Sequence, residues 1–202
     1  APSPLSIGGI TLTGRALLAP MAGVTDPTMR RIASRLGASA TVSEMVTAAG
    51  VARGDRETAM RLECAGVGPR VIQIAAREPE EMAAAARSAE SSGADWIDIN
   101  MGCPCKRVTG GLAGAALMRD LDQAARLIAA AREAICVPLS VKMRLGWDDS
   151  TQNVAELARR AEAEGAAMIT VHGRPRQQFY AGRADWRAIA AAKAAVRIPV
   201  IA

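Results

Sequence analysis

The sequence predicts an α/β fold of the TIM (β/α)8-barrel type, and two observations carry this prediction. Short β-rich segments recur along the chain and a helical pattern follows each of them, which indicates βα units around a parallel sheet. Polar residues gather where these segments end. In a (β/α)8 barrel the carboxyl ends of all strands share the face that carries the active site, so we expect functional residues from several separate strands.

About seven strands are expected, all short and mostly apolar on both faces, as in a sheet buried between two layers. Their ranges are 17–22, 41–45, 71–75, 96–100, 139–144, 168–172 and 198–202. The last range reaches the end of the sequence at Ala202, and no eighth strand follows. We therefore expect an incomplete, truncated barrel with unpaired strand edges.

The helices between these strands have recognisable starts and ends. Pro27 and Pro79 each stand in a first helical turn, where no backbone N–H is needed. Gly37, Gly93 and Gly165 each precede an alanine just beyond a helical pattern, where a left-handed residue ends a helix. All three glycine–alanine pairs lead directly into a predicted strand, so the chain repeats one βα unit.

An open, doubly wound sheet is the alternative fold. Such a sheet concentrates its chemistry in a glycine-rich turn after the first strand. Here 20–25 reads Pro-Met-Ala-Gly-Val-Thr, and the stretch 110–114, which we interpret as a loop and helix start, also lacks G-x-G-x-x-G. Candidate site residues spread over many strand ends favour the barrel. They are Met21 and the polar or titratable residues Glu44, Gln73, Asn100, Cys103, Lys142, Arg144, His172 and Arg174.

Composition narrows the class of protein. Half of the 202 residues are apolar and 2% are aromatic, which is typical of a globular domain with an aliphatic core. No apolar run approaches the ~18 residues of a membrane-spanning helix, and the first residues lack the pattern of a secretory signal. Four cysteines do not make a disulfide scaffold, so a reducing, cytoplasmic setting fits best. The net charge of +5 permits nucleic-acid binding without showing it.

Cys103 is the strongest candidate for a catalytic group. It lies in 98–106, Asp-Ile-Asn-Met-Gly-Cys-Pro-Cys-Lys, where a predicted strand turns into a loop at the active face. A thiol with a pKa near ~8.5 is mostly protonated at neutral pH. It can donate a proton, or act as a nucleophile when a neighbouring base or cation lowers its pKa.

The other cysteines are interpreted differently. Cys64 and Cys136 are expected to be small buried core residues, and the role of Cys105 stays open. A metal site is not expected, because the Cys-x-Cys spacing lacks a second ligand pair and His172 is the only histidine in the sequence.

Three polar side chains in the predicted strands need partners. Lys142 lies in an apolar strand, where an ammonium is costly unless an anion meets it. It is expected either to form a salt bridge with Glu44 or Asp98, or to face an anionic cofactor such as a reduced flavin ring. Gln73 has a buried amide that must form hydrogen bonds, and the edge of a heterocycle would serve. His172 is either a satisfied barrel histidine or a ligand contact.

The loop 174–183 combines several arginines with Phe179 and Tyr180. This mixture suits phosphate contacts together with base stacking, although an ordinary loop with a solvated basic face is the alternative interpretation. Arg174 and Arg176 are therefore candidates for substrate binding.

Taken together, several motifs resemble those of the tRNA-dihydrouridine synthases, most closely the bacterial B type. The resemblance covers essentially the whole chain, and the motifs are independent of one another. In family order they are 19–26 (Ala-Pro-Met-Ala-Gly-Val-Thr-Asp), 43–45 (Ser-Glu-Met), Gln73, 98–104 (Asp-Ile-Asn-Met-Gly-Cys-Pro), 141–144 (Val-Lys-Met-Arg), 171–174 (Val-His-Gly-Arg) and 182–186 (Gly-Arg-Ala-Asp-Trp).

The resemblance implies that residues 1–202 are the FMN-binding TIM-barrel catalytic domain of an enzyme that reduces uridine in tRNA to 5,6-dihydrouridine. It implies that hydride passes from FMN to C6, that Cys103 donates a proton to C5, and that NADPH reduces the flavin. The implied flavin contacts are Pro20, Met21, Ala22, Gln73, Lys142 and His172, and the implied substrate contacts are Asn100, Arg144, Arg174 and Arg176.

The resemblance also implies parts that this sequence does not contain. In the family, loops after strands seven and eight grip the FMN phosphate, and a C-terminal helical domain helps to hold tRNA. The expected partner is tRNA, with no metal and no membrane, and the full-length protein is expected to be monomeric. Two other functions stay open: a flavin-barrel dehydrogenase acting on a free pyrimidine, and an inert RNA-binding fragment.

Overall fold

A computed structural model describes residues 4–63 and 66–202. Parallel strands form one curved sheet at its centre. The strands are β3 (Leu17–Leu18), β4 (Ala40–Val42), β5 (Val46–Thr47), β6 (Arg70–Ala75), β7 (Trp96–Met101), β8 (Leu139–Arg144), β9 (Met168–His172) and β10 (Val200–Ile201). They are hydrogen-bonded in the order β3–β4–β6–β7–β8–β9–β10, with the short β5 also paired to β6.

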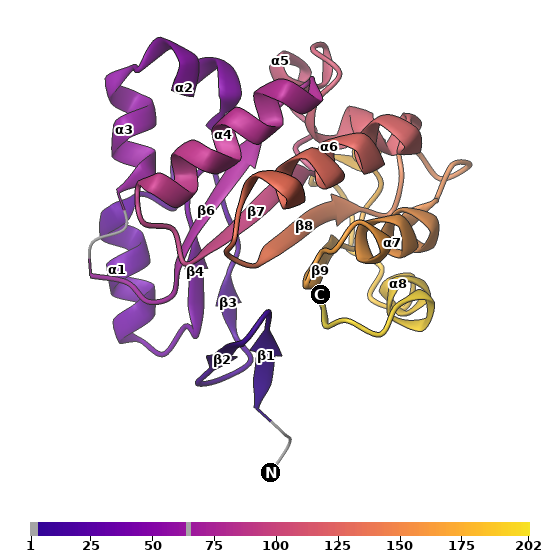
Figure 1. The fold of residues 1–202 in the computed structure, drawn as a ribbon. Helices are drawn as coiled ribbons and strands as arrows, with labels where there is room; N and C mark the ends of the chain where they lie inside the picture. The colour runs from indigo at the N-terminus through magenta and orange to yellow at the C-terminus, as the bar shows by residue number, and fades with distance from the viewer. Residues whose placement is uncertain (1–3, 64–65) are drawn as a thin grey trace.

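Helices alternate with the strands along the chain, and α4, α6 and α7 lie side by side along one face of the sheet (Figure 1). The helices are α1 (Pro27–Arg35), α2 (Ala48–Arg53), α3 (Arg56–Leu62), α4 (Pro79–Ser91), α5 (Lys106–Thr109), α6 (Leu121–Ala134), α7 (Val154–Ala163) and α8 (Ile189–Ala195), with 3-10 turns at Gly114–Arg119 and Arg176–Gln178. The described strands do not close into a ring, because β10 and β3 are the two edges of the sheet. The predicted fold class, an incomplete TIM-type barrel, is confirmed.

The helix boundaries follow the predicted signals. Asp26 caps α1 by accepting a hydrogen bond from the backbone N–H of Met29 at 2.7 Å, directly before Pro27. Gly37, Gly93 and Gly165 adopt positive φ angles of 101°, 93° and 87° just past the ends of α1, α4 and α7. The three glycine–alanine pairs therefore end helices as predicted, because glycine reaches the left-handed region without a steric penalty.

Side chains alternate strictly along the central strands. Ile97 and Ile99 of β7 are buried in one large apolar cluster with residues of α4 and α6. Because successive side chains of a strand point to opposite faces, Asp98 and Asn100 face the other side, which is the barrel interior. The prediction that the strands are mostly apolar on both faces is therefore wrong for the inner faces of β7 and β8, where Asp98, Asn100, Ser140 and Arg144 form internal hydrogen bonds and Lys142 has none among the described residues.

A hairpin that the sequence analysis missed closes the amino end of the barrel. Strands β1 (Leu5–Ile7) and β2 (Ile10–Leu12) pair antiparallel, and the turn residues Gly8 and Gly9 have positive φ angles of 54° and 92°. Ile7 and Leu12 pack in a second apolar cluster with Val71, Trp96 and Met168, which lie near the starts of β6, β7 and β9. The Gly-Gly pair between two apolar runs is the signal that predicts such a turn.

Three predicted strands differ in their boundaries. The range 17–22 is a strand only over Leu17–Leu18, because the chain then turns around Thr25. The range 41–45 is a strand only over its first two residues, in β4, and β5 begins just after it at Val46; both strands pair with β6. The range 198–202 is a strand only over Val200–Ile201, directly after Pro199, which has no N–H for a sheet ladder.

Candidate active site

The register of the strands brings polar residues of β6, β7 and β8 together in the barrel interior, toward the carboxyl ends of the strands. Gln73 of β6 pairs with Asp98 of β7, and Asp98 pairs with Ser140 of β8. One row further toward the carboxyl ends, Asn100 pairs with Lys142. Neighbours in register point their side chains to the same face of a sheet, so the predicted gathering at one end of the barrel is confirmed for these residues.

Asn100 holds the loop that carries Cys103. Its Oδ1 accepts hydrogen bonds from the backbone N–H groups of Gly102, at 3.1 Å, and of Cys103, at 2.9 Å. Its Nδ2 donates to Oε1 of Gln73 at 2.8 Å. An amide has two donors and one carbonyl oxygen, so one N–H of Asn100 stays available for a substrate, while the rest of the side chain supports the loop.

Gln73 finds its partners inside the protein. The side chain is 1% exposed, and its Nε2 donates to Oδ2 of Asp98 at 2.8 Å while its Oε1 accepts from Asn100. The predicted need for hydrogen bonds is confirmed, but the partners are a carboxylate and an amide of the barrel instead of a heterocycle edge.

Asp98 is the buried centre of this layer. It is 3% exposed, and the hydroxyl of Ser140 donates to its Oδ1 at 2.5 Å. Burial raises the pKa of Asp98 to about 6, against the opposing effects of the hydrogen bonds from Ser140 and Gln73 and of the Lys142 charge. Asp98 was predicted only as a salt-bridge partner of Lys142, although a carboxylate within an apolar strand was itself a signal.

The ammonium of Lys142 makes no hydrogen bond or ion pair with the residues that the structure describes. Burial lowers its pKa, and the charge of Asp98 opposes this effect from beyond ion-pair distance. The alternative of a salt bridge with Glu44 is wrong, because Glu44 instead accepts a hydrogen bond from the backbone N–H of Gly23 at 2.6 Å. Lys142 is therefore a cation in the barrel interior that a bound anion could neutralise.

Cys103 is half-buried and free of any disulfide. Burial raises the pKa of its thiol, while a backbone hydrogen bond at Cys105 and the positive charges of Arg144 and Lys142 lower it. The raised pKa keeps the thiol protonated at neutral pH, as a proton donor requires. The effects of Arg144 and Lys142 place both cations within electrostatic range of the sulfur.

His172 and Arg174 form a pair after β9. Nη1 of Arg174 lies 3.0 Å from Nε2 of His172, and since a guanidinium only donates, this ring nitrogen is the acceptor. Burial lowers the pKa of His172 to about 4, with further contributions from the charges of Arg144, Lys142 and Arg174. The imidazole is therefore neutral near pH 7.

Arg174 also donates hydrogen bonds to the backbone oxygens of Ala181, at 3.1 Å, and Gly182, at 3.0 Å. Its guanidinium thus shapes its own loop. With the contact to His172, three of its five N–H groups have partners in the protein, and the substrate contact predicted for Arg174 stays a prediction.

Arg144 connects the two loops of the site. It is 1% exposed, and it donates to the backbone oxygens of Gly102 at 2.7 Å, Phe179 at 2.9 Å and Pro175 at 3.2 Å. Its guanidinium also lies 5.5 Å from the ring centre of Tyr180. Arg144 thus lies buried as a link between the Cys103 loop and the loop after β9, and its predicted substrate contact stays a prediction.

Arg176 stacks on aromatic rings at the edge of the site. Its guanidinium carbon lies 4.6 Å from the ring centre of Trp147 and 4.7 Å from that of Phe179. Arg119, which the sequence analysis did not single out, lies 4.9 Å from the same Trp147 ring. Of the arginines predicted to bind substrate, Arg176 alone has a buried Nε without a hydrogen-bond partner among the described residues.

A cavity of about 220 Å³ lies beside Lys142 and His172. Cys103 is not among the residues that line it. Lys142 does line it, and the charge of Lys142 also acts on the Cys103 thiol. A larger, shallow groove of about 630 Å³ lies between α7 and α8, away from all the predicted site residues. The lining residues of the smaller cavity are Ala19, Lys142, Thr170, Val171, His172, Gly173, Ala184, Trp186, Ile189 and Ala202.

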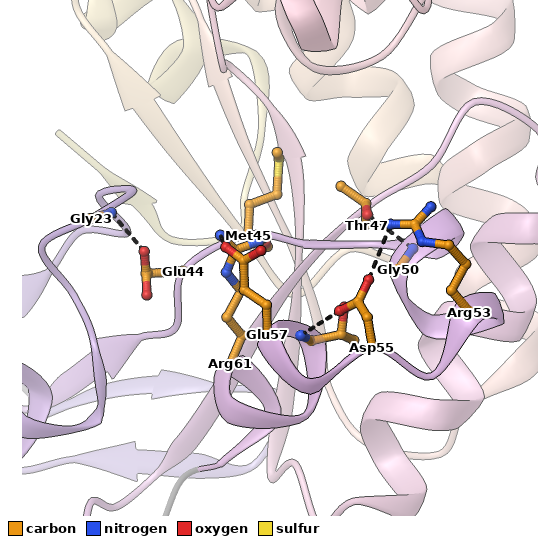
Figure 2. A network of polar contacts seen from close by, with 10 residues as sticks. Gly23, Glu44, Met45, Thr47, Gly50, Arg53, Asp55, Glu57 and Arg61 are labelled. Carbon is orange, nitrogen blue, oxygen red and sulfur yellow. Dashed lines mark hydrogen bonds and ion pairs between the residues drawn. The ribbon is translucent and has the colours of Figure 1, made fainter.

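The loop after β3 carries the predicted flavin contacts Pro20, Met21 and Ala22. The backbone N–H of Met21 donates to Oγ1 of Thr25 at 2.9 Å, which closes a tight turn. Figure 2 shows Glu44 reaching Gly23 in this turn, so that the loops after β3 and β4 are joined.

A second set of contacts in the same view anchors the loop after β4. Arg61 of α3 donates to the backbone oxygen of Met45 at 3.1 Å and pairs with Glu57 at 2.5 Å (Figure 2). The chain between β4 and β5 is therefore held from the helical side as well, through α3.

Two expectations for the remaining cysteines have different outcomes. Cys136 is exposed, so its interpretation as a buried core residue is wrong; it follows α6 in a surface turn where Glu90 accepts its backbone N–H at 2.7 Å. Cys64 lies outside the described residues.

Within 4–63 and 66–202, no group of three or more His, Cys, Asp or Glu side chains could hold a metal ion. None of the helices in these ranges is long and apolar enough to cross a membrane.

Comparison with known proteins identifies relatives along the whole chain. A "Probable tRNA-dihydrouridine synthase" of Rhizobium leguminosarum bv. phaseoli is 49% identical over 193 residues, covering 96% of this chain and 61% of the relative. One of Rhodobacter capsulatus is 51% identical, covering 98% and 62%. The "tRNA-dihydrouridine synthase B" of Xanthomonas campestris is 46% identical, covering 98% and 60%. The chain thus spans about three fifths of the length of these relatives.

Solved structures agree on the fold. A variant of NCR from Zymomonas mobilis matches with a TM-score of 0.60 at 14% identity, covering 98% of this chain and 76% of that one. Phosphonopyruvate hydrolase matches with a TM-score of 0.51 at 16% identity, covering 92% and 73%. At such low identity these likenesses concern the fold alone.

The family model described as "Dihydrouridine synthase (Dus)" matches residues 17–202, which include every predicted site residue. It begins at β3, just after the hairpin of β1 and β2. Together with relatives at 46–51% identity, this match shows that the chain belongs to the dihydrouridine synthase family.

Proposed function

We propose that this chain is the flavin-binding catalytic barrel of an enzyme that reduces uridine in tRNA to 5,6-dihydrouridine, with FMN as cofactor and NADPH as reductant. The relatives named as tRNA-dihydrouridine synthases and the family match support this proposal. The observation that carries it is that the Cys103 thiol, in the loop after β7, and the Lys142 ammonium of the neighbouring strand β8 lie within electrostatic range of each other.

The residues present fit a flavin. The 220 Å³ cavity offers mostly apolar walls, together with the Lys142 ammonium and the neutral His172 ring. A cation that has no ion-pair partner in the described residues suits a ring system that becomes anionic on reduction. Pro20, Met21, Ala22 and Gln73 do not line this cavity, so their assignment as flavin contacts stays a proposal.

The chain's own groups have separate tasks in this proposal. FMN, when bound, supplies the hydride that a uracil ring accepts at C6. Cys103 holds a proton on Sγ and donates it toward C5, Asn100 offers its remaining N–H to the uracil, and Lys142 balances negative charge beside the ring. Because these groups lie inside a barrel mouth, the uridine has to leave its stack to reach them.

Purified, intact protein tests this function. We expect bound flavin by its visible absorbance, and NADPH oxidation that requires tRNA transcribed without modifications and yields dihydrouridine by mass spectrometry. The control substrates are free uridine and free uracil, which should leave NADPH oxidation at its background rate. NADPH oxidation driven by a free pyrimidine would replace the proposal with a dehydrogenase of small pyrimidines, and a protein without flavin would indicate an inert RNA-binding fragment.

Further properties of the whole protein are proposals of the same kind. We propose that it binds tRNA through surfaces at the barrel mouth that include Arg176, and that it acts in the cytoplasm as a monomer. The role of Arg176 is supported by its stacked, incompletely hydrogen-bonded guanidinium.

A further inference from the structure

One continuous hydrogen-bond chain runs from the buried centre of the barrel to the backbone of Cys103. Trp96 Nε1 donates to Ser140 Oγ at 2.7 Å, and the Ser140 hydroxyl donates to Asp98 Oδ1 at 2.5 Å. The chain continues from Asp98 Oδ2 to Gln73 at 2.8 Å, from Gln73 to Asn100 at 2.8 Å, and from Asn100 to the N–H of Cys103 at 2.9 Å.

The directions of the bonds between Asp98, Gln73 and Asn100 follow from the Asp98 carboxylate. An ionised carboxylate accepts hydrogen bonds and donates none, so Gln73 must turn its NH2 group toward Asp98 and its oxygen toward Asn100. Asn100 must then turn its NH2 group toward Gln73, which leaves its oxygen facing the loop. Only the oxygen can accept the N–H groups of Gly102 and Cys103.

We propose that Asp98 is a positioning residue for Cys103, because its charge fixes the orientation of the Gln73 and Asn100 amides and thereby the loop that holds the thiol. This inference rests on the proposed function, in which Cys103 is the proton donor. It assigns to Asp98 a task beyond that of a counter-charge for Lys142, which is the simpler role for a carboxylate in this place.

A neutral amide at position 98 would remove this directionality. Asn has nearly the shape of Asp, but it can present either an oxygen or an NH2 group to Gln73. With an NH2 group toward Gln73, both amides of the chain would turn over. Asn100 would then present its NH2 group to the backbone N–H groups of Gly102 and Cys103, which are donors themselves. Buried polar groups left unsatisfied in this way are costly. The substituted amide can also keep its oxygen toward Gln73, but a neutral acceptor binds a buried NH2 group less strongly than a carboxylate does, so the chain that holds the loop is weakened in both cases.

The test compares three variants of the intact protein, all carrying Cys105→Ala so that the tryptic peptide 88–106 has one thiol. Asp98→Asn removes the charge. Gln73→Met cuts the chain but keeps the charge of Asp98. Ser140→Ala is the matched control, because it removes the hydrogen bonds of Ser140 with Asp98 and Trp96 yet leaves the carboxylate and both amides in place.

The first readout is the rate at which iodoacetamide alkylates Cys103 without tRNA, followed by mass spectrometry of that peptide. We expect Asp98→Asn and Gln73→Met each to raise the rate by ~5-fold, the equivalent of losing about one hydrogen bond in the loop. Ser140→Ala should stay within a factor of about two of the parent. Melting temperatures identify any variant that fails to fold, and Gln73→Met then tests the chain without Asp98→Asn.

The second readout is the kinetics of dihydrouridine formation. We expect Asp98→Asn to lower kcat by ~10-fold, because a displaced donor is misaligned, and to leave KM for tRNA nearly unchanged. An unchanged alkylation rate in Asp98→Asn and Gln73→Met would overturn the inference, as would an equal rise in Ser140→Ala. If the parent makes no dihydrouridine, the proposed function fails, whereas the alkylation rates still decide whether Asp98 positions Cys103.

Discussion

Hydrogen bonding determines the role of each polar residue in the barrel mouth more than its place in a motif does. Gln73 and Asn100 stand where the family resemblance expects cofactor and substrate contacts, yet most of their bonding capacity is used within the barrel. Lys142 is the opposite case, since its ammonium has no such partner in the described residues. The sequence predicted which residues lie at the barrel mouth. It did not predict which of their polar groups bond within the barrel and which stay available for a ligand, because that depends on strand register.

His172 gives a prediction for stability against pH. Its pKa is about 4 in the folded protein, chiefly through burial, and about 6.5 in an unfolded chain. Between these values the unfolded chain binds more protons, so stability is fully present above pH ~6.5 and is lost as the pH falls toward 4.

His172→Gln keeps an acceptor for Arg174 but does not titrate. We expect urea unfolding to show a smaller loss of stability from pH 7 to pH 5 in His172→Gln than in the parent protein. Protonation of Asp98 has the opposite effect, because its raised pKa adds stability as the pH falls. This contribution is the same in both proteins. Parallel curves of stability against pH for the two proteins would show that the pKa of His172 is not lowered in the folded protein.

The loops at the carboxyl ends of the strands depend on links that cross from one element to another. Arg144 of β8 joins the Cys103 loop to the segment after β9, and Glu44 joins the loop after β4 to the turn after β3. The predicted strands placed all of these loops on one face. Their mutual contacts were not predictable, because a sequence motif does not show which side chain reaches a neighbouring backbone.

Glu44→Ala should free the turn that includes Gly23 without unfolding the barrel. We expect amide exchange of the segment 20–25 to become ~5- to 10-fold faster, which corresponds to the loss of about one hydrogen bond. Hydrogen-exchange mass spectrometry measures it. Glu156→Ala, which removes the ion pairs with Arg159 and Arg160 on the surface of α7, is the matched control and should leave this segment unchanged. Equal exchange rates in Glu44→Ala and the parent would mean that the turn keeps its conformation without the hydrogen bond to Glu44.

The whole molecule is an open part of a barrel, in which α-helices cover the outer face of the sheet and a hairpin closes its amino end (Figure 1). The order of βα units was predictable from helix caps and the repeated glycine–alanine pairs. The hairpin was not predicted, although Gly8 and Gly9 marked its turn. The polar side chains of the central strands were recognised, but their hydrogen-bond partners were missed because these depend on strand register.

The 202-residue chain on its own presents two strands, β3 and β10, each bonded on one side only among the described residues. Such edges offer unpaired backbone groups to another chain. We therefore expect this chain to self-associate with rising concentration, as measured by sedimentation velocity. A sharp monomer peak over a hundredfold range of concentration would show that the side chains at these edges already prevent pairing.

The central claim is that Cys103, and not the neighbouring Cys105, donates the proton at the barrel mouth. Its most direct test is the dihydrouridine content of tRNA in cells that lack this gene and carry the intact protein as parent, Cys103→Ala or Cys105→Ala. Loss of a general acid costs ~10²- to 10⁴-fold in rate, so we predict that the parent and Cys105→Ala restore dihydrouridine and that Cys103→Ala does not. Full restoration by Cys103→Ala, or equal loss in both variants, would contradict the account.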